Sequence, residues 1–251
     1  MADLTDDDLT LTAIPSDTEV ALQLLWSQCP PGALAAGGRI RTALRSQVYG
    51  IVKDRTAVDR ELERLRLAGT LRVLQLPARR DEHMLVAADC YFSALAEDAS
   101  DGPARAAVAE RSTALTVSGL SDGAIDALAH HGWVLLTPPV RVGPDEAPPD
   151  PVWLWTVPKC GSMGNHLQTA RREVLRALGR HRLGAAPRLA IERSVAKKLR
   201  EVDLDLSFVL RELVGTELLT IEEHHAGSNL ALTADGRAVA TGVVAAGKRK
   251  R

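Results

Sequence analysis

The chain has 251 residues and a formal net charge of −1. Its three cysteines are widely spaced with no CxxC, which argues against a disulfide framework or a zinc site. Apolar residues make up 45% of the chain but aromatic residues only 3%, which predicts helix-rich domains with cores of leucine, valine and alanine. No apolar run reaches the length of a membrane span, and the acidic start lacks the basic residues of a secretory signal, so we expect a soluble, intracellular protein.

Charge is unevenly distributed along the sequence. Residues 1–38 contain six acids and no lysine or arginine, whereas residues 159–200 contain eleven lysines and arginines against two glutamates. A basic block of this size is typical of surfaces that bind phosphate groups. The last four residues, KRKR, form a second basic element. We therefore predict an acidic flexible N-terminus, residues 1–16, and a flexible basic tail, residues 236–251.

The first folded unit is predicted over residues 17–100. Apolar periodicity places helices near residues 17–28, 39–51 and 55–68, followed by a hairpin whose second strand is HMLVA. At the start of the third of these helices, Thr56 and Asp59 resemble a capping box.

Two further units repeat this pattern. The second, residues 101–158, has candidate helices at 103–114 and 122–131 and a hairpin whose proline-rich loop, RVGPDEAPPDP, cannot be a strand. The third, residues 159–235, has candidate helices at 165–181, 188–199 and 205–214 and a hairpin around EEHHAGS. In each unit one glycine separates a helix from a β-rich run, namely Gly69, Gly132 and Gly215. Helices followed by a hairpin, repeated along the chain, predict an α+β, helix-rich fold of three tandem winged-helix domains.

Two neighbouring helices of the third unit carry basic ridges. Projected at about 100° per residue, both helices place their basic residues opposite an apolar arc. These basic residues are Arg172, Arg176 and Arg180 in the first helix and Arg193, Lys197 and Arg200 in the second. Arginines often only solvate an exposed face, but these faces lack the acids that would form ion pairs along the helix. We therefore expect the ridges to bind nucleic-acid phosphate.

The basic residues of the first unit give a weaker signal. Acids lie among the arginines of helix 55–68, so intrahelical ion pairs account for much of its charge. Arg55 differs because it lies at the entrance of the helix, beside backbone amides that favour phosphate. Arg79 and Arg80, near the predicted turn of the hairpin, suit a backbone contact and a solvated turn equally well.

The sequence gives little support for catalysis. A protein kinase needs a glycine-rich phosphate loop, a strand lysine, an HRD catalytic loop and a DFG aspartate, and none of these motifs is present. The pairs His130-His131 and His224-His225 fall at a helix end and a hairpin tip, where polar residues are common without a metal. No cysteine has an identifiable base partner. We therefore predict no catalytic residue, no metal and no cofactor.

The segment LRSQVYGIVKDRTAVDRELERLRLAGTLRVLQL, residues 44–76, resembles the family long named serine/threonine-protein kinase 19. A weaker match runs from VWLWTVP, residues 152–158, through RREVLRALGRHR to the NLALT strand. The resemblance implies tandem winged-helix, DNA-binding proteins of transcription-coupled nucleotide excision repair, despite the kinase name. Together with the basic ridges, it implies the DNA-binding residues Arg55, Arg171, Arg172, Arg176, Arg180, Arg182, Lys197 and Lys198.

The resemblance also implies partners. The protein would bind double-stranded DNA and act as a repair adaptor with stalled RNA polymerase II, a ubiquitin-ligase substrate receptor and the repair helicase of the general transcription factor. We expect a nuclear protein, with the cytoplasm as a second location, that is a monomer or a DNA-associated homodimer and stays outside membranes. Two alternatives remain open: a winged-helix scaffold that binds partner proteins in a nuclear complex and, more remotely, a serine/threonine protein kinase.

Overall fold

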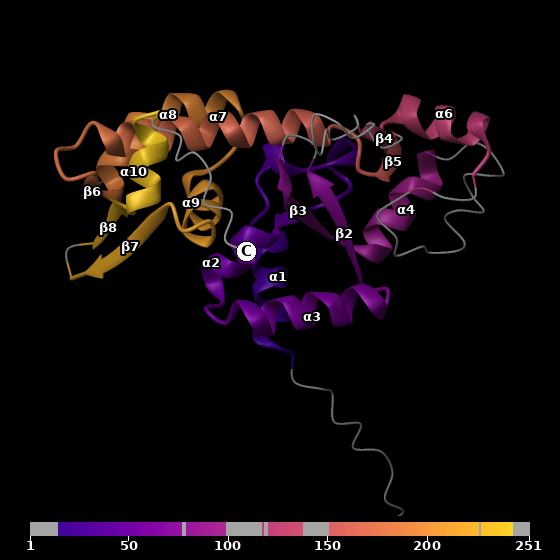
Figure 1. Ribbon diagram of the computed structural model, residues 1–251, viewed down its shortest axis with the longest axis horizontal. Coiled ribbons are helices and arrows are strands. Elements are labelled where there is room, and N and C mark those ends of the chain that lie inside the picture. The colour runs from indigo at the N-terminus through magenta and orange to yellow at the C-terminus, as the bar shows by residue number, and fades with distance from the viewer. Residues whose placement is uncertain are drawn as a thin grey trace, which may run out of the picture.

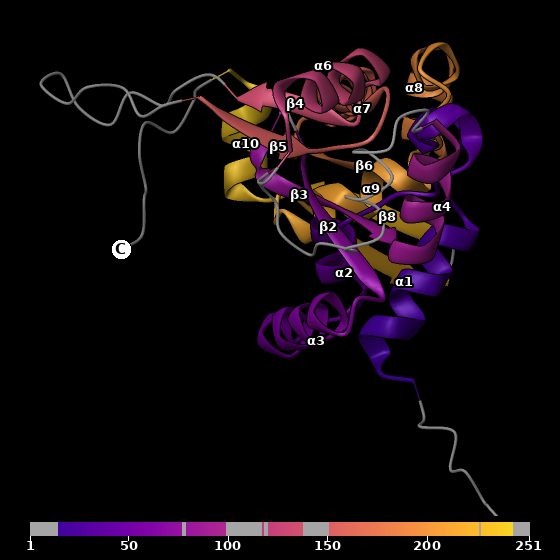
Figure 2. The same cartoon turned by 90° about the vertical axis from the view of Figure 1, so that its right-hand side faces the viewer.

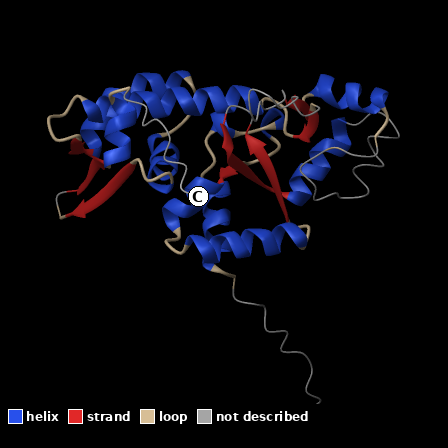
Figure 3. Ribbon diagram, in the orientation of Figure 1, coloured by secondary structure: helices blue, strands red, loops and turns tan. Residues whose placement is uncertain are grey.

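The computed structural model shows an α+β protein rich in helix (Figure 1), in which helices surround small antiparallel sheets (Figure 3). It describes residues 15–76, 79–98, 117, 120–137, 151–225 and 227–242. The predicted fold class is confirmed at this level. None of the described helices combines the length and the apolar character that a membrane crossing requires.

The N-terminal unit contains the first sheet. Its elements are α1 (Asp17–Ser27), β1 (Ala43–Leu44), α2 (Arg45–Ile51), α3 (Arg55–Leu67), β2 (Leu71–Leu76) and β3 (Arg79–Ala87), with 3-10 turns at Pro31–Ala33 and Ala36–Gly38. The strands lie in the order β1-β3-β2, so the short strand joins the free side of the hairpin. One helix, a short strand, two helices and a hairpin form the predicted winged-helix arrangement.

The predicted helix 39–51 is too long. The helix begins only at Arg45, because Ala43 and Leu44 are extended and pair with β3. Both side chains are fully buried, and because neighbouring strand residues point to opposite faces, Ala43 and Leu44 contribute to two different apolar clusters. An apolar pair can belong to a helix or to a strand, and here pairing with a strand distant in sequence decides between them.

The predicted capping box at the start of α3 is also wrong. Asp54 caps the helix instead, and its carboxylate accepts a hydrogen bond from the backbone N–H of Ala57 at 3.0 Å. Asp59 does not reach back to the helix start, because its carboxylate accepts a hydrogen bond from the hydroxyl of Tyr49 on α2. The cap therefore lies two residues earlier than the sequence pattern indicated.

A helix absent from the sequence predictions, α4 (Ala88–Asp98), follows β3 directly. It buries Tyr91 over β2, where the guanidinium carbon of Arg72 lies 5.3 Å from the centroid of the Tyr91 ring. Trp133, from the next unit, packs edge-on against the same ring at 5.4 Å and donates its indole N–H to Asp98 at 3.2 Å. Figure 2 shows this side of the molecule, with α6 above α4. The helix thus joins the first unit to the middle one.

The middle unit is described only in part. Its helix α6 (Asp122–His131) ends at Gly132, which has a φ of 80°, and leads into the hairpin of β4 (Val134–Thr137) and β5 (Val152–Trp155). The backbone N–H of Val117 donates to the Trp153 carbonyl at 2.9 Å, so Val117 lies beside β5. In the first unit, β1 lies beside β3 in the same way. The predicted helix 103–114 and most of the proline-rich loop lie outside the described residues. The count of three winged-helix domains and their boundaries therefore stays a prediction.

The C-terminal unit repeats the topology of the first. Its elements are α7 (Cys160–Gly179), β6 (Ala185–Pro187), α8 (Arg188–Glu201), α9 (Leu206–Gly215), β7 (Leu219–His224) and β8 (Gly227–Leu232), and its strands lie in the order β6-β8-β7. A further helix, α10 (Ala234–Ala240), packs on α7.

The presence of α10 corrects the prediction of a flexible tail from residue 236. Thr233 caps this helix by accepting a hydrogen bond from the backbone N–H of Gly236 at 3.1 Å. Gly236 also lies so close to Leu218, the residue before β7, that a Cβ there would be 1.9 Å from the Leu218 carbonyl oxygen. The KRKR end lies outside the described residues.

The first and third units meet along α2 and α9. A Cβ on Gly215 would lie 1.6 Å from the carbonyl oxygen of Ser46, and Gly50 approaches the backbone of α9 in the same way. Gln47 is fully buried, and its side-chain amide donates to the carbonyl oxygen of Phe208 at 2.9 Å. One apolar core continues from the first unit into the third. The two units are therefore packed together through backbone contacts that only glycine permits.

Candidate nucleic-acid interface

Arg172 and Arg176 on the outward face of α7, and Arg180 at its C-cap, are spaced four residues apart. Because each residue turns an α-helix by about 100°, this spacing keeps the three side chains on one side. The opposite side packs into the core through Val174 and Leu178, which are fully buried. All three arginines are exposed, so the predicted row exists on the surface.

A tight turn after α7 exposes one more arginine. The backbone N–H of His181 donates to Leu178 at 3.0 Å, and that of Gly184 donates to His181 at 2.8 Å. Gly184 has a φ of 64°, a conformation that glycine adopts without strain. Arg182 is exposed within this turn. The turn therefore extends the basic surface from α7 toward α8.

The outward face of α8 continues the same surface. Arg193, Lys197 and Arg200 are exposed, and Ile191 and Val195 hold the opposite side in the core. We call the exposed cations of the two helices and their turn the α7–α8 basic face. Its residues are Arg172, Arg176, Arg180, Arg182, Arg193, Lys197, Lys198 and Arg200.

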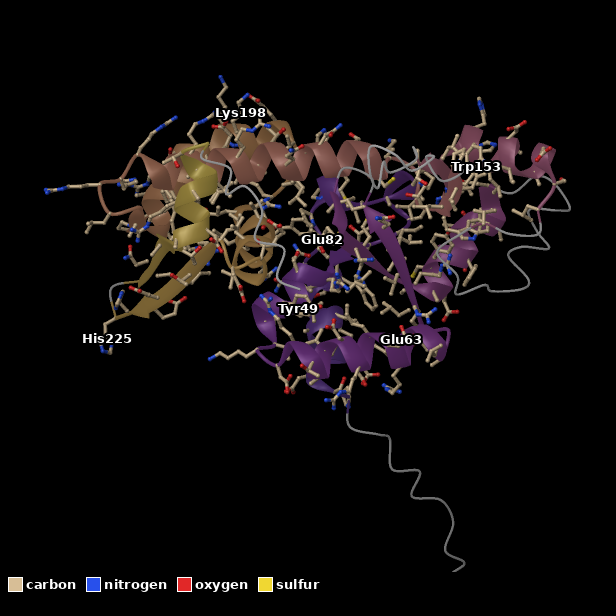
Figure 4. All side chains as sticks on the ribbon, in the orientation of Figure 1. Tyr49, Glu63, Glu82, Trp153, Lys198 and His225 are labelled. Carbon is tan, nitrogen blue, oxygen red and sulfur yellow. The ribbon has the colours of Figure 1, made fainter. Side chains whose placement is uncertain are left out.

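Few of these charges are neutralised. Arg176 pairs with Glu173 at 2.7 Å and Lys198 pairs with Glu201 at 2.6 Å, both exposed pairs three residues apart. Exposed pairs of this kind contribute little stability and yield easily to another anion. The other six cations have no ion pair among the described residues. Figure 4 places Lys198 on the upper edge of the molecule and Glu63 of α3 on the lower edge.

Arg171 is a correction to the predicted set. Its side chain is only 14% exposed, and its guanidinium pairs at 2.9 Å with Glu212 of α9, which is fully buried. An arginine that neutralises a buried carboxylate cannot leave it for phosphate without exposing an uncompensated charge in the core. Arg171 therefore joins α7 to α9 and lies outside the α7–α8 basic face. The signal that sequence reasoning missed is an acid, Glu212, within the otherwise apolar run of α9.

Arg55 also has partners within the chain. Its guanidinium donates to the carbonyl oxygen of Gly215 at 2.8 Å and pairs with Glu217 at 3.0 Å. The same group lies 5.1 Å from the centroid of the Tyr49 ring. Its side chain is still 44% exposed. Arg55 thus ties the start of α3 to the end of α9, and its predicted contact with phosphate remains a prediction.

In helix-turn-helix proteins, the second helix of the motif enters the DNA groove, and α3 and α9 hold this position. Helix α9 is not available to enter a DNA groove, because it packs on α2 and its residues Phe208, Val209 and Leu213 are buried. On α3 the charges are mixed, with Arg64 paired to Glu61 at 2.6 Å and other arginines and acids nearby. The basic surface therefore lies on α7 and α8, above the core, while α3 lies below it (Figures 1 and 2).

The β7–β8 hairpin of the C-terminal unit is acidic rather than basic. In β7, Glu222 and Glu223 are exposed, and His224 lies 3.7 Å from Glu222. These carboxylates repel phosphate, so this wing is unsuited to a backbone contact. Arg79 and Arg80 begin β3, and their side chains lie outside the described residues.

The remaining candidate groups show no catalytic arrangement. Cys160 is buried beside Thr156, and burial raises the pKa of its thiol, which keeps it protonated. The rings of His130 and His131 lie edge to face with centroids 5.6 Å apart. Among the described residues, no group of three or more histidines, cysteines or acids is placed to hold a metal ion.

Comparison with known proteins gives a family model and two relatives. A family model described as inactive serine-threonine protein kinase 19 matches residues 41–227. The chain is similar to winged helix repair factor 1 of Mus musculus, with 38% identity over 66 residues that cover 26% of each chain. It is also similar to winged helix repair factor 1 of Homo sapiens, with 44% identity over 48 residues that cover 19% of each chain. The chain therefore aligns with about a quarter or less of the length of these relatives.

Proposed function

The chain belongs to the inactive serine-threonine protein kinase 19 family, and we propose that it binds double-stranded DNA through phosphate contacts rather than acting as a kinase. The observation that carries the proposal is the α7–α8 basic face, eight exposed cations of which two have an ion-pair partner among the described residues. Concentrated positive charge with few internal partners favours a polyanion. The names of the two relatives point to a role in repair.

The composition of this surface favours duplex backbone over base recognition. Residues 171–201 contain no asparagine or glutamine, the residues that read adenine edges best. They also contain no phenylalanine, tyrosine or tryptophan, on which the bases of single strands stack. Arginine and lysine remain, and these neutralise phosphate regardless of sequence. We therefore expect low sequence specificity and a preference for duplex.

A titration of fluorescent duplexes tests the proposal. Two unrelated duplexes of equal length should bind with affinities within about threefold of each other, because phosphate contacts carry no sequence information. If six cations contact phosphate, the logarithm of the affinity should fall with the logarithm of salt concentration with a slope of about −5. An affinity that does not change with salt concentration, or no binding to a duplex at low salt, would exclude phosphate recognition.

In the cell, we propose that the protein acts as an adaptor in transcription-coupled nucleotide excision repair. Its partners would be stalled RNA polymerase II, the ubiquitin-ligase substrate receptor and the repair helicase of the general transcription factor, and its location would be the nucleus. The family and the repair-factor names of the relatives support this role. Cells without the protein should recover transcription slowly after ultraviolet damage, whereas normal recovery would contradict it.

A second candidate function is a winged-helix scaffold for protein partners. The observation that favours it is that the two elements with which a winged helix usually contacts DNA are unsuited to DNA in the C-terminal unit. Helix α9 is buried against α2, and the β7–β8 hairpin is acidic. Pull-down from nuclear extract with and without a nuclease separates the two functions. Partners that stay bound after DNA is digested indicate a scaffold, and partners lost with the DNA indicate the DNA-binding role.

A further inference from the structure

Helix α10 lies beside α7 on the C-terminal unit (Figure 1), and a groove runs between the two helices. Its volume is about 490 Å³, within the range of pockets that bind ligands. Three arginines of α7 and apolar residues of both helices line it. The lining residues are Gln168, Arg171, Arg172, Leu175, Arg176, Val239, Ala240 and Gly242. The groove therefore offers positive charge and apolar surface side by side.

The arginines of the groove are held in different ways. The Arg171 side chain is only 14% exposed and pairs at 2.9 Å with the buried carboxylate of Glu212, so its position is set before any ligand arrives. Arg176 has only an exposed partner, Glu173, and Arg172 has no ion pair among the described residues. None of the described residues that line the groove is acidic. Arg172 and Arg176 can therefore bind carboxylates with two parallel hydrogen bonds.

The shape of the groove excludes a DNA duplex from its interior. Helices in contact have axes about 8–10 Å apart, whereas the major groove of a duplex alone is about 12 Å wide. A duplex on the α7–α8 basic face would reach the exposed Arg172 and Arg176 but would leave Arg171 and Leu175 without a ligand. The described lining residues also include no aromatic ring on which the bases of a single strand would stack. An extended peptide remains, because single side chains fit between two helices.

The apolar part of the groove indicates what this peptide carries besides acids. Val239 and Ala240 of α10 lie there with Leu175 of α7, and Val239 is 50% exposed. A peptide made of acids alone would leave Val239 in contact with water. An aliphatic side chain placed between the acids would cover it, and both surfaces would lose their contact with water.

We propose that the α7–α10 groove binds an acidic segment of a partner protein, in which carboxylates flank an aliphatic side chain. The carboxylates contact Arg171, Arg172 and Arg176, and the aliphatic side chain covers Val239. This inference rests on the scaffold function and defines the kind of partner that the scaffold takes. Because Arg172 and Arg176 also belong to the α7–α8 basic face, the bound segment competes with DNA, and this competition alone rests on the DNA-binding function.

Fluorescence anisotropy with labelled peptides tests the chemistry of the ligand. The probe is a peptide of about ten residues that repeats Asp-Asp-Leu, and a control peptide of equal charge repeats Asp-Asp-Ser. The leucine peptide should bind the full chain at least about tenfold more tightly than the serine peptide, because only leucine covers Val239. Equal affinities would show binding by charge alone and would overturn the proposal, as would a leucine peptide that does not bind.

Two matched substitutions locate the binding site. Val239→Asp places a carboxylate in the groove beside its arginines and should weaken binding of the leucine peptide at least about tenfold. The control is Val20→Asp on α1, because Val20 is 49% exposed, lies in a helix as Val239 does, and lies outside the groove. This control should change the affinity less than about twofold. Equal affinities of the two variants would place the peptide elsewhere and contradict the proposal.

A milder change at the same position guards against a loss of folding. Val239→Ser removes apolar surface without adding charge, and it should reduce the preference for the leucine peptide over the serine peptide to less than about threefold. Thermal unfolding of each variant shows that the chain is folded. A folded Val239→Ser variant that keeps the full preference for leucine would refute the contact with Val239.

Displacement of DNA separates this inference from the DNA-binding function. Excess leucine peptide should release a fluorescent duplex from the parent and from Val20→Asp, but should release much less from Val239→Asp at the same concentration. A peptide that binds in the groove and leaves the duplex bound would refute the competition. If no chain binds a duplex, the DNA-binding function fails, while the peptide titrations still decide whether the groove binds an acidic segment.

Discussion

Reversing two charges of the α7–α8 basic face should weaken DNA binding far more than reversing two charges around α3. The first pair of changes is Arg180→Glu and Lys197→Glu, on side chains that are exposed and have no ion pair among the described residues. The second pair is Lys53→Glu and Arg60→Glu, which are also exposed and share these features but lie beside and on α3. Each pair replaces one arginine and one lysine, so the change in net charge is the same.

The size of the effect follows from the release of counterions. Each phosphate contact contributes about 0.9 to the slope of log affinity against log salt, so losing two contacts makes the slope shallower by about 1.8. Between 1 M and 0.1 M salt, this difference amounts to about 60-fold in affinity, or about 2.4 kcal/mol at the lower concentration. The control pair should cost less than about threefold, because long-range effects between exposed charges are screened.

Fluorescence anisotropy with one duplex, over a series of salt concentrations, measures both affinity and slope. Thermal unfolding of each variant serves as the control for folding, and the melting temperatures should match that of the parent, since exposed substitutions usually change stability by no more than about 0.5 kcal/mol. If the control pair around α3 reduces affinity and slope as much as the pair on α7 and α8, the basic face has been assigned to the wrong side of the molecule.

Two further outcomes follow from buried features of the fold. Gly215→Ala should destabilise the protein by about 3 kcal/mol in urea unfolding, because its Cβ would meet the Ser46 carbonyl oxygen. The control, Gly123→Ala on α6, has no atom within 4 Å of its Cβ and should be neutral or slightly stabilising. Equal unfolding midpoints for the two variants would refute the tight contact of α2 and α9. Burial and then the hydrogen bond to Asp59 raise the pKa of Tyr49 to about 12, and burial also raises the pKa of Tyr91. Because both pKa values are raised on folding, their contribution to stability is complete below about pH 10 and is lost as the pH rises toward 12. The absorbance of tyrosinate should therefore stay low at pH 10 in the folded protein and appear there only in urea, and early ionisation of the native chain would contradict this burial.

Local patterns predicted much of this molecule from its sequence, and long-range packing explains the rest. The arginine row of α7 could be predicted because its spacing and the buried Val174 stripe lie within one helix. The role of Arg171 could not, because its partner Glu212 stands forty-one residues away on another helix. The same reason applies to α2, whose start is set by pairing with β3 rather than by its own sequence. The predicted winged-helix topology is present in the first and third units, while their joint packing is a property of the tertiary structure.

The contact between α2 and α9 also bears on how the chain acquires its fold. During synthesis, α2 leaves the ribosome long before α9, and domains generally fold in the order in which they emerge. The apolar face of α9, with Phe208 and Leu213, is shielded from water only when it packs on the surface of α2 that includes Gln47. The N-terminal unit therefore provides the template on which the C-terminal unit completes its core. Released on its own, the C-terminal unit would present an apolar helix to solvent, the kind of surface that chaperones bind and that promotes aggregation.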